Sequence, residues 1–356
     1  MDRRSAHTRY HRLALLTAAL GFAAIPASFA KPQSDDAAAA PRAEDSGGSL
    51  TLLVDNDAFS SGGDRNYTSG IFLGYVSALG PLPKILSNAS TLTHAFTGAK
   101  PTYWGFGLGH SIFTPDDLTA NPAPADQHPY AGFLYAQLLI AAEEDRERPR
   151  YLDLYSLDVG LIGPAAQGEA VQRNLHRLIR GVDPQGWDSQ LRNEGVFAVG
   201  IERRWRATAL LSKALPGGLE ADFTPGLGFS AGNLRVYGKG SIGFRIGSRF
   251  TDDWGPPRIR PGISGIGQVP ADGGFGWYLF GGAEVRGVAR DIFLDGNTFR
   301  PSARVDKRNV VLDVQWGAAI QADGWRLVYT YVTRTEEFVT QTAAQDFGSI
   351  AISHRF

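Results

Sequence analysis

A short stretch near the start of the chain collects residue types that could bind a hard metal ion. The run 51–75 reads as two alternating strands joined by a turn rich in Ser and Gly. Asp55, Asn56 and Asp57 end the first strand and Thr68 lies early in the second, so alternation predicts that Asp57 and Thr68 share one face. Carboxylate, hydroxyl and carbonyl oxygens are the ligands that Ca²⁺ prefers, although the spacing is not that of an EF-hand. On spacing alone, a solvated turn is the simpler interpretation.

A second candidate group lies further along, in the segment 161–193. Apolar residues at helical spacing predict an amphipathic helix over 167–180. Gln172 and His176 lie four residues apart and share one stripe of that helix. His176 is the best candidate for a general base, because an imidazole titrates near neutral pH. The plainer interpretation is a surface histidine, since the sequence holds 7 histidines in all.

Composition narrows the class of protein. The chain has 356 residues, no cysteine, 43 glycines and a formal net charge of −1. The absence of cysteine excludes a disulfide framework, a thiolate zinc site and a cysteine nucleophile. The charge balance gives no indication of a nucleic-acid partner. The sequence also lacks the G-x-S-x-G, H-E-x-x-H and P-loop motifs, so a serine-hydrolase, zinc-protease or nucleotide-binding interpretation has little support.

The N-terminal residues have the features of a secretory signal. A basic head of four arginines precedes a short apolar run over 13–22, and Ser28-Phe29-Ala30 offers small residues for cleavage after Ala30. The apolar run is shorter than the roughly 20 residues of a membrane-spanning helix. The segment 31–48, rich in Ala, Pro and Asp, is expected to be a disordered lead-in. The domain that folds is expected to cover 49–356.

Period-2 alternation over about ten residues, the length of a tilted membrane strand, recurs along the remaining chain. We predict an all-β fold, a transmembrane antiparallel barrel of about 12 strands, with a short helix in an outward loop. Aromatic residues such as Trp316 and Tyr331 favour the membrane barrel over a soluble sandwich or lipocalin-like barrel. The predicted strands are 49–57, 67–77, 103–113, 130–142, 150–161, 194–206, 220–231, 235–248, 275–290, 308–321, 325–335 and 345–356.

Strand parity then predicts where the candidate residues lie. If the N-terminus is periplasmic, the connections 57–68, 114–129 and 162–193 face the cell exterior, and Asp57 and Thr68 face the barrel lumen. A short helix is expected over 84–93. The Gly- and Pro-rich segment 249–274 gives no clear structural prediction.

Several segments together resemble the LpxR family of outer-membrane lipid A 3′-O-deacylases. The resemblance runs in matching order over nearly all of the chain that follows the signal. The matching segments are Asn56-Asp57, Asp64 to Gly70, Ser111 to Pro115, Pro129 to Tyr135, Gly163-Pro164, Gln172 with His176, and Gly186-Trp187-Asp188.

The resemblance implies a twelve-stranded barrel that hydrolyses an ester with Ca²⁺ as its cofactor. Asn56, Asp57, Thr68 and His176 would then be the active-site residues, with Asp57 as a metal ligand. The chain departs from the family where an acidic residue is expected shortly after the histidine. Val182 stands there, and the neighbouring Asp183 is the expected substitute as a metal ligand.

The same resemblance implies the partners of the protein. The substrate would be lipid A of the lipopolysaccharide, whose phosphates suit arginines near the barrel mouth, and Arg65, Arg173 and Arg177 are the candidates. The location would be the bacterial outer membrane, which the chain would enter with the barrel-assembly machinery. Two alternatives stay open: a non-enzymatic barrel that serves as a channel or structural protein, and an esterase acting on another lipid.

Overall fold

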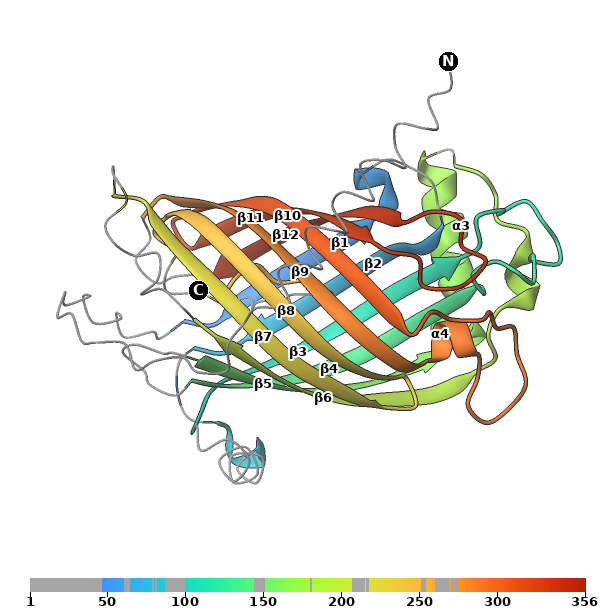
Figure 1. Ribbon diagram of the computed structural model, residues 1–356, viewed down its shortest axis with the longest axis horizontal. Coiled ribbons are helices and arrows are strands. Elements are labelled where there is room, and N and C mark those ends of the chain that lie inside the picture. Colours follow the sequence, from blue (N-terminus) through green and yellow to red (C-terminus); the bar gives the residue numbers. More distant parts are fainter. Residues whose placement is uncertain are drawn as a thin grey trace, which may run out of the picture. The chain divides into compact units, whose positions relative to one another are not determined.

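The computed structural model describes residues 47–60, 65–78, 80, 82–86, 100–143, 151–179, 181–206, 215, 218–250, 254–259, 269 and 274–356. These residues form a closed antiparallel barrel of twelve strands, in which each strand pairs with the next and β1 pairs with β12 (Figure 1). The strands are β1 (Ser49–Asn56), β2 (Asn66–Val76), β3 (Lys100–Thr114), β4 (Ala131–Glu143), β5 (Tyr151–Ile162), β6 (Glu194–Trp205), β7 (Glu220–Gly232), β8 (Arg235–Ser248), β9 (Gly276–Asp291), β10 (Val310–Ala322), β11 (Trp325–Arg334) and β12 (Gln345–Arg355). The predicted barrel is thereby confirmed.

Each strand divides its side chains between two environments. On β10, Val314 and Trp316 are exposed on the outer face, whereas Asp313 and Gln315 are buried inside the barrel. Successive strand residues point to opposite faces, so alternating sequence places apolar groups toward lipid and polar groups inward. None of the described helices is long and apolar enough to cross a membrane.

Aromatic side chains gather where β1 begins and β12 ends. Trp325 stacks on His354 with ring centroids 4.2 Å apart, and Tyr75 meets Trp104 edge-on at 5.4 Å. Such rings suit the level where lipid headgroups meet water. We call this the terminal end of the barrel. The opposite end is called the α3 end, because it bears the helix α3 (Gly168–Ile179) between β5 and β6.

Charged side chains fill much of the barrel interior in paired form. Lys239 lies 3.0 Å from Glu284, and Arg286 and Arg334 each lie 2.9 Å from Asp313. All five side chains are buried. A buried charge is costly unless it is paired and hydrogen-bonded, so this network binds neighbouring strands together across the lumen wall.

The connection between β8 and β9, which sequence patterns leave without a clear prediction, enters the barrel. Trp254 Nε1 donates a hydrogen bond to Glu143 Oε1 at 2.7 Å, and Arg258 Nη1 donates to Gln315 Oε1 at 2.7 Å. Ile259 packs in an apolar cluster with Leu53 and other inward side chains. Residues 254–259, which we call the inner plug, therefore occupy the lumen.

A second element fills the barrel at the α3 end. The short helix α4 (Ile292–Asp295) follows β9, and the Asp291 side chain caps it by accepting a hydrogen bond from Phe293 N. The Phe293 ring stacks on Phe113 at 4.1 Å and meets Phe133 at 5.6 Å. These rings belong to one buried cluster, so α4 closes the interior over the inner plug.

The strand boundaries predicted from the sequence agree with the structure to within a few residues. The predicted helix over 167–180 is confirmed as α3. Of the predicted helix over 84–93, only a 3-10 turn over Lys84–Leu86 falls within the described residues. The signal peptide predicted over 1–30 lies outside the described residues, as does nearly all of the lead-in over 31–48.

Candidate active site

The tip of the β1–β2 hairpin is held by two local hydrogen bonds. The Asn56 side chain accepts from Ala58 N at 2.8 Å and thereby caps the 3-10 turn η2 (Asp57–Phe59). Asp57 is buried, and its Oδ2 accepts a hydrogen bond from Arg65 N at 3.1 Å across the hairpin. The carboxylate is thus fixed by the backbone of its own hairpin.

A β-bulge interrupts the pairing of β2 with β3 between Tyr67 and Ser69. Tyr67 points into the lumen, where its Oη donates to Asp55 Oδ2 at 3.1 Å. The Thr68 Oγ1 lies 2.6 Å from Thr114 Oγ1. Thr114 was not among the predicted site residues, although the segment 111–115 carries part of the family resemblance.

The bulge overturns one prediction from strand parity. Ser111 and Phe113 line the interior of the barrel, whereas His110 and Ile112 contact the β5–β6 connection on the outside. Thr114 shares the face of Ile112 by alternation, so the Thr68 hydroxyl lies on the outer face and not in the lumen. The extra residue of a bulge shifts the side-chain order, which parity counting cannot anticipate.

The β5–β6 connection packs directly on this outer face. Ile112 forms a buried cluster with Leu118, Tyr130 and Trp187, and the His110 Nε2 lies 2.8 Å from Ala166 O. Helix α3 begins at Gly168, where an added Cβ would stand only 2.7 Å from the Cα of Gly132 on β4. Glycine is therefore needed for the helix to lie so close to the barrel wall.

His176 lies on the buried side of α3. Only 3% of the residue is exposed, and Nδ1 forms a short hydrogen bond with the backbone oxygen of Val182. A carbonyl oxygen can only accept, so Nδ1 carries the proton in the neutral ring. The lone pair is then on Nε2, which is the form that a general base requires.

Gln172 lies one turn before His176 and is also buried. Its Oε1 accepts a hydrogen bond from Trp187 Nε1 at 2.8 Å, which fixes the orientation of the amide, because an indole N–H can only donate. Nε2 is buried and has no hydrogen-bond partner among the described residues. The family resemblance pairs Gln172 with His176, but only the structure shows how Trp187 orients it.

The other predicted residues have local partners. Arg173 pairs with Glu169 at 2.9 Å and with Asp183 at 2.5 Å. Asp183 is well exposed and also accepts a hydrogen bond from Gln185. Arg177 donates to the Asn174 side chain, and Arg65 contributes its backbone N–H to Asp57.

Asp57, Thr68 and His176 lie at the same end of the barrel. β1 ends there, β2 begins there, and α3 follows the same end of β5. A family model described as "Outer membrane protein LpxR" matches residues 15–356. The chain belongs to the LpxR family. It is accordingly an outer-membrane protein.

One solved structure agrees with membership in the LpxR family at the level of the fold. LpxR from Salmonella typhimurium matches with a TM-score of 0.68 and 22% sequence identity, covering 86% of this chain and 100% of that one. The β domain of the Bordetella autotransporter BrkA reaches a TM-score of 0.41 at 10% identity, covering 86% of this chain and 98% of that one. A search of curated proteins finds no match.

The residues of this LpxR-family site offer oxygen ligands, the type that a hard cation prefers. The described residues contain no group of three or more His, Cys, Asp or Glu side chains that could hold a metal. Buried oxygen atoms nevertheless lie at this end of the barrel: the Asp57 carboxylate, the Thr68 and Thr114 hydroxyls, and Asn66 Oδ1, which has no hydrogen-bond partner among the described residues. Oxygen ligands of this kind fit Ca²⁺, with water and substrate completing the shell.

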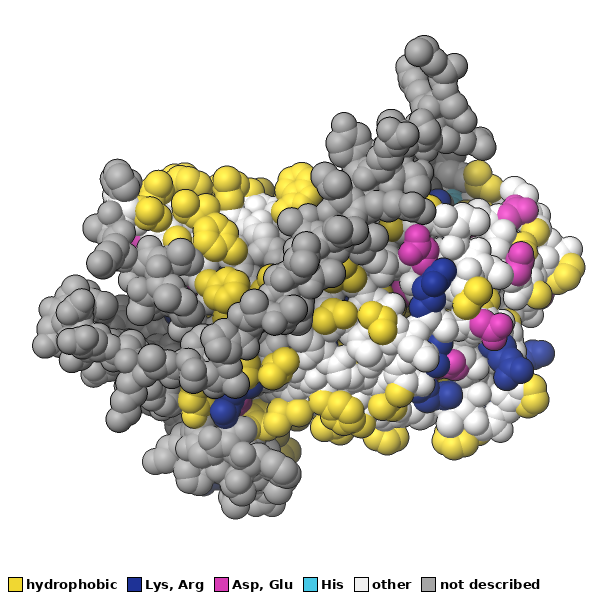
Figure 2. Space-filling model, in the orientation of Figure 1, with side chains coloured by type: hydrophobic (Ala, Val, Ile, Leu, Met, Phe, Trp, Pro, Cys, Tyr) yellow, Lys and Arg dark blue, Asp and Glu magenta, His cyan; other side chains and the backbone are white. Residues whose placement is uncertain are grey.

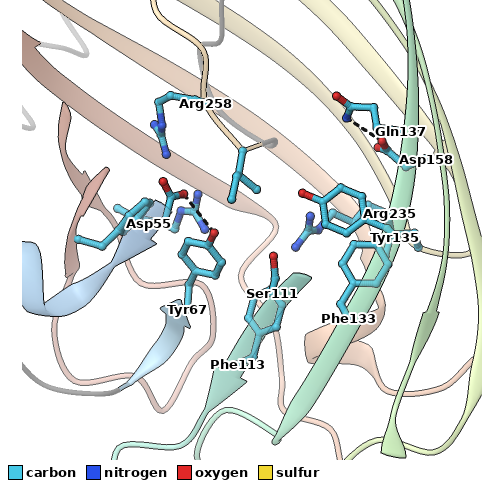
Figure 3. A pocket seen from close by; sticks show the side chains of 14 residues that line it. Asp55, Tyr67, Ser111, Phe113, Phe133, Tyr135, Gln137, Asp158, Arg235 and Arg258 are labelled. Carbon is cyan, nitrogen blue, oxygen red and sulfur yellow. Dashed lines mark hydrogen bonds between the residues drawn. The ribbon is translucent and has the colours of Figure 1, made fainter. Parts of the chain in front are cut away.

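The barrel also holds a cavity on the other side of the wall. Figure 3 shows Asp55, Tyr67, Ser111, Tyr135 and Arg258 among the side chains that line it. None of Asn56, Asp57, Thr68 and His176 lines this cavity. The lumenal cavity and the candidate LpxR-family site are therefore separated by the strands β1 to β3.

Proposed function

We propose that the chain is an outer-membrane lipid A deacylase that hydrolyses a 3′-linked acyl (acyloxyacyl) ester, with His176 activating the water. The observation that carries the proposal is the buried His176, whose Nδ1–H is bonded to the Val182 carbonyl, so that Nε2 is the basic nitrogen of the ring. Family membership supports the same activity. A site on the outer wall, under α3, suits a substrate that lies in the surrounding leaflet.

In the proposed reaction, His176 Nε2 takes a proton from a water molecule, and the resulting hydroxide attacks the ester carbonyl carbon. The tetrahedral oxyanion collapses by breaking the bond between carbon and the sugar oxygen. The imidazolium then returns its proton to that oxygen, which gives a free fatty acid and a sugar hydroxyl. The hydrogen bond from Nδ1 to Val182 O orients the ring throughout.

Asp57 is the residue that would hold a calcium ion, and the Thr68 and Thr114 hydroxyls and Asn66 Oδ1 at the same end of the barrel are the other candidate oxygen ligands. A bound calcium ion would supply positive charge where the oxyanion develops. Asn56 stabilises the turn that presents Asp57, through its cap on η2. The buried Nε2 of Gln172 is a further donor available on the same side of α3 as His176.

Arg173 and Arg177 were expected to bind lipid phosphates, but both have partners within or next to α3. Arg173 has two carboxylate partners, and Arg177 is bonded within its own helix. We therefore assign these arginines to the stability of α3. Asp183 pairs with Arg173 and is exposed, so we propose Asp57 and not Asp183 as the acidic metal ligand.

A channel is the main alternative, and the interior of the barrel disfavours it. The inner plug and α4 both occupy the lumen in the described part of the chain. An esterase acting on a different lipid uses the same site chemistry. Mass spectrometry of the extracted lipids distinguishes these activities.

The test compares lipid A from Gram-negative cells that express the wild-type chain, His176→Ala, His176→Asn or no chain. Lipid A that has lost the mass of the 3′-linked acyl group should appear only in cells with the wild-type chain. In His176→Ala and His176→Asn, the rate of acyl release should fall on the order of 1,000-fold. His354→Asn, which changes a histidine at the terminal end, is the matched control and should keep full activity. Identical lipid A profiles for wild type and His176→Ala would refute the proposal. Release of fatty acid from another lipid, with lipid A unchanged, would favour the second esterase.

A further inference from the structure

A group of exposed arginines lies at the α3 end, on the connection between β9 and β10. Arg300, Arg304 and Arg308 are exposed, and so is Arg192, which precedes β6. None of the four forms an ion pair with a described residue. We call these four residues the arginine surface. Figure 2 shows dark blue side chains where Figure 1 draws this connection in orange.

The backbone that carries the arginine surface is firmly held. Arg192 N donates to Asn297 Oδ1 at 2.8 Å, and Asn297 Nδ2 donates back to Arg192 O at 2.9 Å. The Glu194 carboxylate accepts from Thr298 N at 2.9 Å and from the Asn297 side chain at 3.0 Å. These bonds join the segment that carries Arg192 to the start of the connection that carries the other three arginines.

Buried apolar contacts also stabilise the connection between β9 and β10. Leu294, Val305 and Phe338 form a small buried cluster, and Val305 N donates to Leu294 O at 2.8 Å. The local carboxylates are already used: Asp295 lies 3.3 Å from Lys307 Nζ, and Asp291 pairs with Arg235 at 2.9 Å. Glu337, whose backbone oxygen accepts from Arg308 N, pairs with Arg334 at 3.5 Å. The four arginines therefore outnumber the remaining acidic neighbours, which are the exposed Asp306 and the partly exposed Glu336.

The position of Arg308 along the barrel axis follows from its place next to β10. Arg308 lies two residues before Val310, the first residue of β10, with a bend of the chain at Asn309 between them. Val310, Val314, Trp316 and Ile320 form the lipid-facing column of β10 and are each well exposed. Arg308 thus lies close to the α3 end of the lipid-facing column, where lipid headgroups meet water.

We propose that the arginine surface binds the phosphate groups of anionic lipids in the outer leaflet beside the barrel. A guanidinium binds phosphate through two parallel hydrogen bonds, and the exposed Phe299 adds an apolar side chain that suits the same interface. Strand order places β9 and β10 far from β2 and β3 around the barrel, so this lipid is a neighbour and not the lipid in the candidate active site. The inference rests on the outer-membrane location and not on the proposed activity.

Native mass spectrometry of the full chain in neutral detergent tests the proposal. The probe is phosphatidic acid, a phosphate monoester lipid without the ester of the proposed substrate, and phosphatidylcholine serves as the neutral comparison. We expect preferential binding of phosphatidic acid by the wild type. The variant Arg300→Gln/Arg304→Gln/Arg308→Gln should bind it on the order of 100-fold more weakly. The corresponding triple lysine variant should bind more tightly than the glutamine variant and more weakly than the wild type, since it keeps the charges but loses the paired hydrogen bonds.

Two controls locate the effect. Lys84→Gln removes an exposed charge at the terminal end, and His176→Ala changes the candidate active site; both should bind phosphatidic acid as the wild type does. Each variant is first checked for a folded barrel by its heat-modifiable gel mobility. Unchanged binding in the triple glutamine variant overturns the proposal, as does an equal loss in Lys84→Gln. A lysine variant as weak as the glutamine variant would overturn its electrostatic basis.

Discussion

The hydroxyl oxygens of Thr68 and Thr114 lie 2.6 Å apart, and they join the bulged start of β2 to the end of β3. Both side chains are buried. The pair links the hairpin that carries Asp57 to the strand on which the β5–β6 connection packs. The position of the acidic tip relative to α3 therefore depends on this contact.

We expect Thr114→Val to lower the deacylation rate without unfolding the barrel. Valine keeps the shape of the side chain but leaves the buried Thr68 hydroxyl without this partner, at a cost of about 1–3 kcal/mol. We expect a rate loss on the order of 10-fold, measured by lipid A mass spectrometry. Thr102→Val is the matched control, because Thr102 is buried near the terminal end of the same strand. Equal rates for the two variants would contradict a role of the Thr68–Thr114 contact.

Asp57→Asn should separate folding from calcium binding. The amide oxygen still accepts from Arg65 N, so the hairpin is preserved, but the negative charge is lost. We expect the calcium concentration for half-maximal activity to rise by about 10-fold or more, since charge dominates the affinity of oxygen sites for Ca²⁺. Asp306→Asn is the control, because it removes an exposed carboxylate from the connection between β9 and β10, away from the candidate site. A calcium dependence unchanged by Asp57→Asn would remove Asp57 as the metal ligand.

Gly168→Ala should lift α3 from the wall. The added Cβ would meet the Gly132 backbone at 2.7 Å, and backbone atoms cannot rotate away. We expect lower activity and faster proteolytic cleavage between β5 and β6, in a barrel that remains folded. Gly195→Ala is the control, since a Cβ at that glycine meets no atom within 4 Å. Equal cleavage rates in the two variants would show that α3 tolerates the displacement.

Because the inner plug occupies the lumen, we expect the barrel to conduct few ions. Trp254 donates to Glu143 and lies 4.2 Å beneath the Arg206 guanidinium, so Trp254→Ala removes both contacts. In planar lipid bilayers we expect the wild type to be nearly silent and Trp254→Ala to show frequent openings. Trp316→Ala, which alters a lipid-facing tryptophan, should behave like the wild type. Large steady conductance from the wild type would favour the channel alternative.

His128 predicts a pH dependence for the connection between β3 and β4. Burial lowers the pKa of His128 below its usual 6.5, and the ring lies between Phe113 and Phe338. When the β3–β4 connection opens, His128 is exposed and regains its usual pKa. As the pH falls below 6.5, His128 therefore binds a proton in the open state but not in the closed state. The closed state loses stability over this range, until the pH reaches the lowered pKa. Protection against hydrogen exchange over 115–130, after correction for the intrinsic exchange rate at each pH, should therefore be lower at about pH 5 than at about pH 7.5. In His128→Gln the rates, corrected for intrinsic exchange, should lose this difference.

The barrel and α3 could be predicted because their signals are periodic. Alternation along β10 and helical spacing around His176 follow directly from the geometry of strands and helices. The last strand, predicted over 345–356, likewise follows from alternation and is observed as β12. These patterns extend over many residues, so one misplaced boundary changes little.

The local details of the site could not be predicted in the same way. The bulge at Thr68 adds one residue to a strand and leaves no trace in composition, yet it changes the face on which the hydroxyl lies. The pairing of Arg173 with Asp183 depends on how the chain returns after α3. The inner plug belongs to a segment rich in Gly and Pro that has no periodicity, so only tertiary contacts define it.

The filled interior constrains the traffic of any lipid that this protein processes. In the described part of the chain, the inner plug and α4 obstruct the barrel lumen, so the interior provides no path for lipid toward the periplasm. Reactants would have to arrive, and both fragments depart, by diffusion within the plane of the leaflet. Turnover would then depend on the surface density of lipid around the barrel.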